Sequence, residues 1–162
     1  MIHIITTGGT IEGLEYDDPE NKSDGETISI SDFLDSANVS LQYTINNAFQ
    51  KDSRFITPKD RIELAEKIAI ADSEKILITH GTLTMAETAK FLGRLGLDKT
   101  IVLVGALISG VKKNTDAPFN LGYALGAINF LEVGVYVAMN GNIFSWDNVR
   151  KNLDADQFEK EF

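Results

Sequence analysis

The chain has 162 residues, of which 43% are hydrophobic, so its size and composition fit one globular domain with a proper core. Its formal net charge is -9 and it contains no run of lysines or arginines, which excludes the basic surface that nucleic acids and anionic membranes bind. Cysteine is absent, and His3 and His80 are the only histidines, which excludes disulfides, thiolate nucleophiles and histidine-rich metal centres. We therefore expect no metal or other cofactor.

The amino terminus does not have the pattern of an export signal. Its apolar run, residues 2–7, is shorter than the hydrophobic region of a signal peptide and has no basic leader. No later apolar stretch approaches the roughly 20 residues that span a bilayer. The sequence therefore predicts a cytoplasmic protein with no membrane partner.

The amino-terminal third predicts two strands, a loop and a short helix. Residues 2–7 are apolar and β-branched, as a first strand would be. Residues 12–26 are rich in acids, glycine and turn formers, so a long mobile loop is expected there. Ser31 or Asp32 then caps a helix, and residues 39–45 alternate apolar and polar side chains as a strand near a sheet edge does.

The rest of the chain alternates helix and strand. Caps and apolar stripes indicate helices at 57–71, 84–95, 118–131 and 154–162, and β-branched runs indicate strands at 75–79, 100–106 and 134–139. This alternation is typical of a mostly parallel sheet with helices on both faces. The sequence therefore predicts a single three-layer α/β domain over residues 1–162, of the flavodoxin-like or Rossmann-like kind.

Two glycine turns follow predicted strands and carry hydroxyl groups. In "TTGGTIEG", Gly8 and Gly9 let the backbone approach a ligand, and Thr10 stands beside them. "ILITHGT" repeats this pattern and places Thr82 after the third strand. Ligands of open α/β sheets bind outside the carboxyl ends of the strands, so both hydroxyls are candidate site groups. A purely structural turn is the alternative, and the missing lysine of a P-loop weighs against a nucleotide site.

Three other residues have both a functional and an ordinary explanation. Ser53 follows the second strand and can bind a carboxylate, or it is a loop serine. Lys99 begins an apolar strand, where a lysine is usually a solvated leader. Asp116 precedes a helix and is explained equally well as a cap.

Taken together, five segments resemble one known family. "TTGGTIEG", "DSRFITPKD", "ITHGTLTMAETAKFL", "DKTIVLVGA" and "TDAPFNLG" occur in the order and approximate spacing of the amino-terminal domain of bacterial-type L-asparaginases, a family of threonine amidohydrolases. The resemblance runs from Ile2 to about Phe158. It implies an asparaginase N-terminal-type domain that lacks the family's smaller C-terminal domain.

The resemblance implies roles for individual residues. Thr10 corresponds to the nucleophile, and Tyr16 corresponds to the loop tyrosine that helps to activate it. Thr82 and Lys99 correspond to a second pair of hydroxyl and base, which handles the attacking water or a proton transfer. Ser53 corresponds to the residue that grips the substrate's α-carboxylate. The implied substrate pocket also includes Gly9, Asp52, Gly81, Leu83 and Ala106.

Leu83 departs from the family pattern. Members have an aspartate there, which pairs with the substrate's α-ammonium and orients the lysine. Leucine does neither, and the loss of a charged hydrogen bond costs on the order of 2 to 5 kcal/mol. Activity on L-asparagine is therefore expected to be weak or altered.

Two functions of different classes remain open. The first is an asparaginase-like amidohydrolase that hydrolyses a small amide through an acyl-enzyme at Thr10. The second is a catalytically inactive module that binds a small carboxylate or pairs with a full-length relative. We also expect a homodimer or higher homo-oligomer, because "FLEVGVYVAMNGNIF" offers an apolar edge that another chain should cover.

Overall fold

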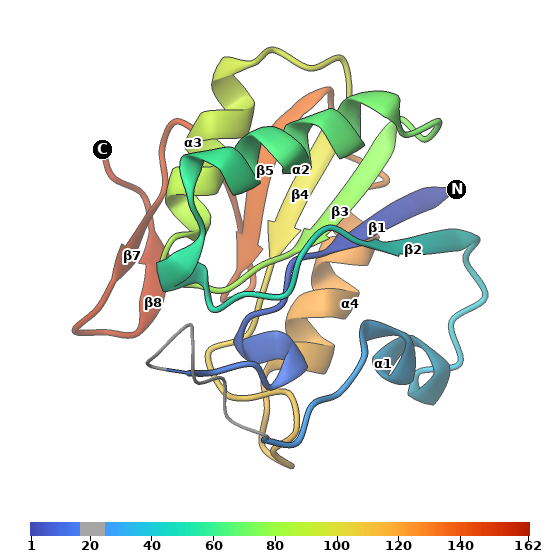
Figure 1. The fold of residues 1–162 in the computed structure, drawn as a ribbon, viewed down its shortest axis with the longest axis vertical. Helices are drawn as coiled ribbons and strands as arrows, with labels where there is room; N and C mark the ends of the chain where they lie inside the picture. Colours follow the sequence, from blue (N-terminus) through green and yellow to red (C-terminus); the bar gives the residue numbers. More distant parts are fainter. Residues whose placement is uncertain (17–24) are drawn as a thin grey trace.

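The computed structural model describes residues 1–16 and 25–162, so part of the predicted loop at 12–26 lies outside the described residues. Its central layer is a six-stranded sheet with the order β2-β1-β3-β4-β5-β6 (Figure 1). The five parallel strands are β1 (Ile2–Thr6), β2 (Tyr43–Asn47), β3 (Lys75–Thr79), β4 (Thr100–Val104) and β5 (Gly134–Met139). A sixth strand, β6 (Asn142–Ser145), pairs antiparallel with β5.

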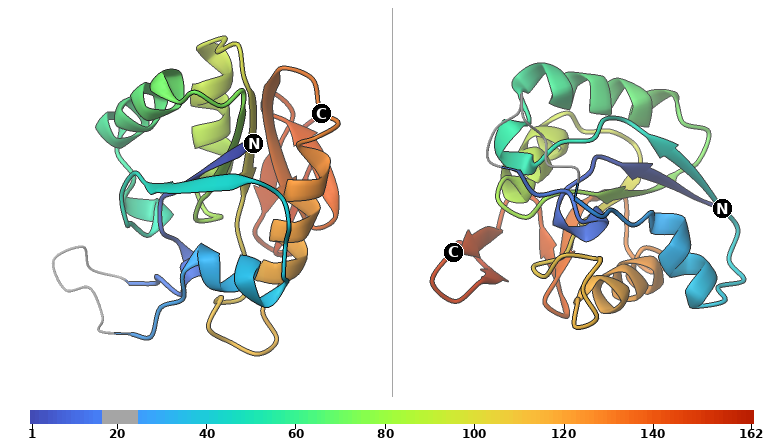
Figure 2. Two further views of the ribbon diagram at one scale, coloured as in Figure 1. Left: turned by 90° about the vertical axis from the view of Figure 1, so that its right-hand side faces the viewer. Right: turned by 60° about the horizontal axis from the view of Figure 1, so that its bottom comes forward.

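Helices cover both faces of this sheet, as Figure 2 shows. The part of the chain that the structure describes forms four α-helices, which are α1 (Ile30–Ser36), α2 (Pro58–Ile70), α3 (Met85–Arg94) and α4 (Ala117–Ala127). Strand side chains alternate between the faces, so Ile76 and Ile78 pack under α2 and α3 while Leu77 packs with α1 and α4. These three residues are fully buried, as expected for a parallel sheet covered on both sides. The predicted three-layer α/β domain is thereby confirmed.

Helix α2 begins where its sequence signals indicate. The Thr57 hydroxyl accepts a hydrogen bond from Asp60 N at 3.2 Å, and the Asp60 carboxylate accepts one from Thr57 N at 2.7 Å. Such reciprocal caps satisfy two backbone donors that the first turn leaves unpaired. Helix α1 has the same arrangement, but its cap is Ser29 and not Ser31 or Asp32, because the Ser29 hydroxyl is the one that accepts from Asp32 N.

Two local predictions are wrong and a third is correct only in part. The second strand is β2 and not residues 39–45, since pairing with β1 begins at Tyr43. Residues 154–162 form no helix; the tail instead contains an antiparallel hairpin of β7 (Arg150–Asn152) and β8 (Gln157–Glu159). Within the predicted edge at 130–144, β5 is paired on both sides by β4 and β6, whereas β6 is an end strand of the sheet. The homodimer remains a prediction.

Within residues 1–16 and 25–162, no helix has the length and apolar character needed to cross a membrane.

Candidate active site

The parallel strands bring their carboxyl ends to one edge of the sheet, and the turns that follow β1 and β3 pack directly against each other there. Gly9 has a φ of 86°, and a Cβ at this position would lie 2.6 Å from Gly81 N. A Cβ at Gly81 would in turn lie 2.6 Å from Ser53 Cβ. Only glycine allows backbones to approach so closely, so three predicted motifs meet at one point.

Thr10 lies on the wall of a pocket at this edge. It opens the short 3-10 helix η1 (Thr10–Glu12), and its carbonyl oxygen accepts hydrogen bonds from Gly13 N at 2.9 Å and Gly110 N at 3.0 Å. These contacts fix the main chain while the side chain stays partly exposed. The pocket has a volume of about 330 Å³ and is lined by Thr10, Glu15, Tyr16, Asp52, Arg54 and Leu83.

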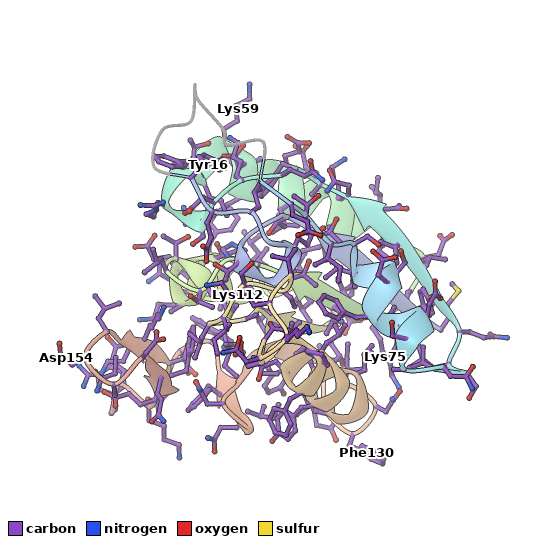
Figure 3. The ribbon with its side chains drawn as sticks, turned by 90° about the horizontal axis from the view of Figure 1, so that it is seen from below. Tyr16, Lys59, Lys75, Lys112, Phe130 and Asp154 are labelled. Carbon is purple, nitrogen blue, oxygen red and sulfur yellow. The ribbon has the colours of Figure 1, made fainter. Side chains whose placement is uncertain are left out.

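Tyr16 contacts the segment that follows β2 through its ring and its hydroxyl group. Its ring stacks on Phe55 with 5.3 Å between centroids, and its hydroxyl accepts a hydrogen bond from Asp52 N at 3.2 Å. The structure therefore brings the predicted loop tyrosine and Thr10 to the lining of one pocket. Figure 3 views the molecule from this edge, with Tyr16 labelled.

Asp52 is engaged by Arg54. The guanidinium donates to both carboxylate oxygens, from Nε at 3.0 Å and from a terminal nitrogen at 2.9 Å. Burial by itself raises the pKa of Asp52, but the hydrogen bonds from Arg54 outweigh it and hold the pKa below its ordinary value. The carboxylate is therefore charged and already paired when it faces the pocket.

Lys151 is the lysine that contacts Thr82. Its ammonium donates to the Thr82 hydroxyl at 2.9 Å from the β7–β8 hairpin, and its side chain is only 12% exposed. Because the hydroxyl oxygen accepts from Nζ, its own proton is directed elsewhere and can be donated to another group. Sequence reasoning missed Lys151 because it interpreted the adjoining tail as a helix.

The predicted pairing of Lys99 with Thr82 is wrong. Lys99 precedes β4, so it lies at the amino end of the strand and at the opposite edge of the sheet. There its ammonium donates to Ala71 O at 2.7 Å and Ser73 O at 2.8 Å.

The remaining predicted pocket residues differ in their access to a ligand. Leu83 is 48% exposed and lines the pocket. Ser53 is 2% exposed, and its hydroxyl accepts a hydrogen bond from Thr84 N at 3.3 Å, so it supports the turn after β3. Ala106 is 1% exposed and packs in the core with Ile11, so it offers no surface to a ligand.

Two buried titratable groups flank the turns. The Glu12 carboxylate accepts a hydrogen bond from Gly8 N at 3.0 Å, and burial, which outweighs this bond, raises its pKa. His80 is fully buried; Nδ1 lies 2.7 Å from Gly81 O and Nε2 lies 2.8 Å from Thr88 Oγ1. Sequence reasoning assigned neither residue a role.

A larger groove of about 730 Å³ runs along β2, from Met1 and Ser73 to Asn47, and neither Thr10 nor Thr82 lines it. We therefore place the candidate site in the smaller pocket. Among the described residues, no three His, Asp or Glu side chains are grouped to hold a metal ion.

Known proteins that resemble this chain belong to the same family as the motifs that meet at this edge indicate. Residues 1–160 match the family model described as "Asparaginase, N-terminal". The chain belongs to the asparaginase family. This asparaginase-family chain is 33% identical over 167 residues to the glutaminase-asparaginase of Acinetobacter glutaminasificans. The alignment covers 93% of this chain and 49% of that relative. It is also 33% identical over 173 residues to L-asparaginase 2 of Escherichia coli, in an alignment that covers 96% of this chain and 47% of that relative.

Solved structures of the asparaginase family have the same fold. The crystal structure of a probable cytoplasmic L-asparaginase from Campylobacter jejuni superposes with a TM-score of 0.82 at 33% identity, covering 98% of this chain and 52% of that one. The chain thus spans about half the length of the curated asparaginases it matches.

Proposed function

We propose that the protein is an asparaginase-like amidohydrolase that hydrolyses a small amide through an acyl-enzyme on Thr10. The observation that supports this most strongly is the placement of two hydroxyl groups at one sheet edge, with Thr10 on the pocket wall and Thr82 in contact with Lys151. A threonine hydroxyl is a poor nucleophile until a neighbouring group takes its proton. Lys151 donates to the Thr82 hydroxyl, and Tyr16 lines the same pocket as Thr10.

Acylation begins with attack of Thr10 Oγ on the amide carbonyl carbon. Tyr16 lines the same pocket and assists removal of the hydroxyl proton. The oxyanion that develops is stabilised by backbone amides of the turns at Gly9 and Thr82. The carbon–nitrogen bond then breaks, the nitrogen takes up a proton, and ammonia leaves an ester on Thr10.

Deacylation needs a water molecule and a second proton transfer. The Thr82 hydroxyl, held by Lys151, orients the water that attacks the ester carbonyl. The ester bond to Thr10 breaks, the carboxylic acid is released and the Thr10 hydroxyl is restored. Lys151 thus takes the role that the resemblance implied for Lys99.

The substrate class follows from Leu83. Its side chain is 48% exposed on the pocket wall, where it presents apolar carbon to a ligand. An ammonium group held against Leu83 loses hydration without gaining a charged partner there, and the pocket carboxylate of Asp52 is already paired with Arg54. L-asparagine is therefore a weak substrate, and ω-amides without an α-amino group fit better.

A second candidate is a module that binds a small carboxylate and does not turn it over. The chain spans about half of its relatives, and the pocket that it builds alone is small and open. Titration calorimetry that shows micromolar binding of succinate without ammonia release from any amide would favour this candidate.

Ammonia release by a purified variant pair tests the proposal. Wild type, Thr10→Val and Thr44→Val are compared on L-asparagine, L-glutamine, succinamate and glutaramate. Thr44 lies on the edge strand β2 and is exposed, so its loss controls for removal of a hydroxyl. We expect wild type and Thr44→Val to hydrolyse at least one ω-amide and Thr10→Val to lose about a hundredfold or more. An unchanged rate in Thr10→Val would refute the nucleophile.

A further inference from the structure

Lys151 lies between a hydroxyl on its inner side and a carboxylate on its outer side. Its Nζ is 2.9 Å from Thr82 Oγ1 and 3.3 Å from Asp156 Oδ1. The Lys151 side chain is 12% exposed, whereas that of Asp156 is 63% exposed. The ammonium is therefore largely withdrawn from water, and the carboxylate that neutralises it stays in contact with solvent.

The hairpin backbone is held independently of this ion pair. Phe158, which pairs with Lys151 in the register, is 4% exposed in the core, and its N donates to Asn140 Oδ1 at 2.8 Å. Arg150 and Glu159 form a further ion pair across the two strands. These contacts place the Lys151 main chain but leave its long side chain to be fixed by contacts of its head group.

A withdrawn ammonium needs a countercharge. One hydroxyl satisfies one of its three donors, and a buried charge without an ionic partner costs more than the same charge in water. We propose that Asp156 is a positioning residue that holds the Lys151 ammonium against Thr82, and that it supplies the carboxylate which Leu83 cannot. As a statement about catalysis, this rests on the proposed function.

The arrangement separates two tasks that the family pattern assigns to one aspartate. The Asp156 carboxylate lies 3.3 Å from Lys151 Nζ, so we assign it to the lysine and not to the ligand. The orientation of Lys151 is then independent of residue 83. Leu83 consequently changes which substrate fits without disabling the pair of Thr82 and Lys151.

Asp156→Asn is a suitable substitution for the test. Asp156 has a φ of 48°, in the left-handed region that asparagine tolerates best among the larger residues, so the turn keeps its shape while the charge is lost. Asp154→Asn is the matched control, because Asp154 belongs to the same turn and forms no ion pair within the described residues. Figure 3 shows Asp154 projecting from the molecule at the hairpin tip.

The first measurement does not depend on turnover. Each protein is acylated with a limiting amount of a water-soluble acetyl ester, and modification of Lys151 is read by peptide mass spectrometry against Lys160 as internal reference. We expect Asp156→Asn to raise the labelling of Lys151 about three- to fivefold, because the freed head group samples solvent. Asp154→Asn should match wild type. Equal labelling in Asp156→Asn and wild type would overturn the proposal.

The second measurement uses the best amide found for wild type. Asp156→Asn should lower kcat about tenfold and leave KM unchanged, since the proposal assigns Asp156 to the lysine and not to the ligand. Increased labelling with an unchanged kcat would overturn the positioning role. If wild type hydrolyses no amide, the proposed function fails, while the labelling still decides whether Asp156 holds Lys151.

Discussion

Acid should weaken the fold through His80. The ring is fully buried, and because Gly81 O can only accept, Nδ1 carries the proton and Nε2 accepts from the Thr88 hydroxyl. Each nitrogen of the neutral ring thus has a hydrogen-bond partner, whereas the additional proton of a charged ring would have none. Burial above all, aided by the charge of Arg61 and opposed by the bond to Gly81, lowers the pKa of His80 from 6.5 to about 4.

The magnitude follows from proton binding. Between the two pKa values the unfolded chain binds a proton at His80 and the folded chain does not, so the free energy of unfolding decreases as the pH falls. The gap from 6.5 to about 4 corresponds to about 3 kcal/mol, present in full above the unfolded pKa and lost as the pH falls towards the folded pKa. Glu12 acts in the opposite sense, because its pKa is raised in the folded state.

Urea denaturation of wild type and His80→Gln at about pH 7 and about pH 4 isolates this contribution. Glutamine can accept the Thr88 hydrogen bond but does not titrate. The free energy of unfolding of wild type should fall by about 3 kcal/mol more than that of His80→Gln. His3→Gln, which removes the other and partly exposed histidine, is the control. Burial, and then the charge of Lys99, lower the pKa of His3 too, so this variant should fall somewhat less than wild type but clearly more than His80→Gln. An equal fall in wild type and His80→Gln would refute the reasoning.

Three further predictions concern the site. Leu83→Asp should raise ammonia release from L-asparagine about tenfold or more, because it gives the α-ammonium a charged partner; no gain would contradict the pocket assignment. Lys151→Met should lower kcat about a hundredfold, whereas Lys99→Met, which loses two bonds to backbone carbonyls far from the pocket, should lower Tm and leave kcat unchanged; the reverse pattern would exclude Lys151 from the reaction. Gly81→Ala should cost about 1 to 3 kcal/mol in urea denaturation, because its Cβ would lie 2.6 Å from a serine Cβ, while Gly122→Ala, with no atom within 4 Å, should be neutral or stabilising; equal effects would contradict the close packing.

The layered fold could be predicted because its signals are local. The capping box of α2 and the β-branched run of β3 each determine one element from neighbouring residues. The tail could not, since Phe158 and Phe162 have the four-residue spacing of a helix. The structure buries Phe158 and leaves Phe162 89% exposed, so long-range contacts of the hairpin decide against the local pattern.

The error over Lys99 has a topological cause. In a parallel sheet all amino ends lie at one edge and all carboxyl ends at the other, so a lysine that precedes a strand cannot face a hydroxyl that follows one. This rule follows from the predicted parallel arrangement of the strands alone. The correct partner, Lys151, could not be found in the same way, because its place depends on how a hairpin 69 residues beyond Thr82 packs against the core.

The close contact between Gly9 and Gly81 is made by main-chain atoms, and not by side chains. The main chain therefore fixes the spacing of the two loops that carry Thr10 and Thr82, whichever side chains surround them. Leu83 can be exchanged without moving the hydroxyl-bearing loops apart, because its side chain takes no part in this contact. Such a scaffold is open to new specificities at its rim, and it resists change at the two smallest residues in its centre.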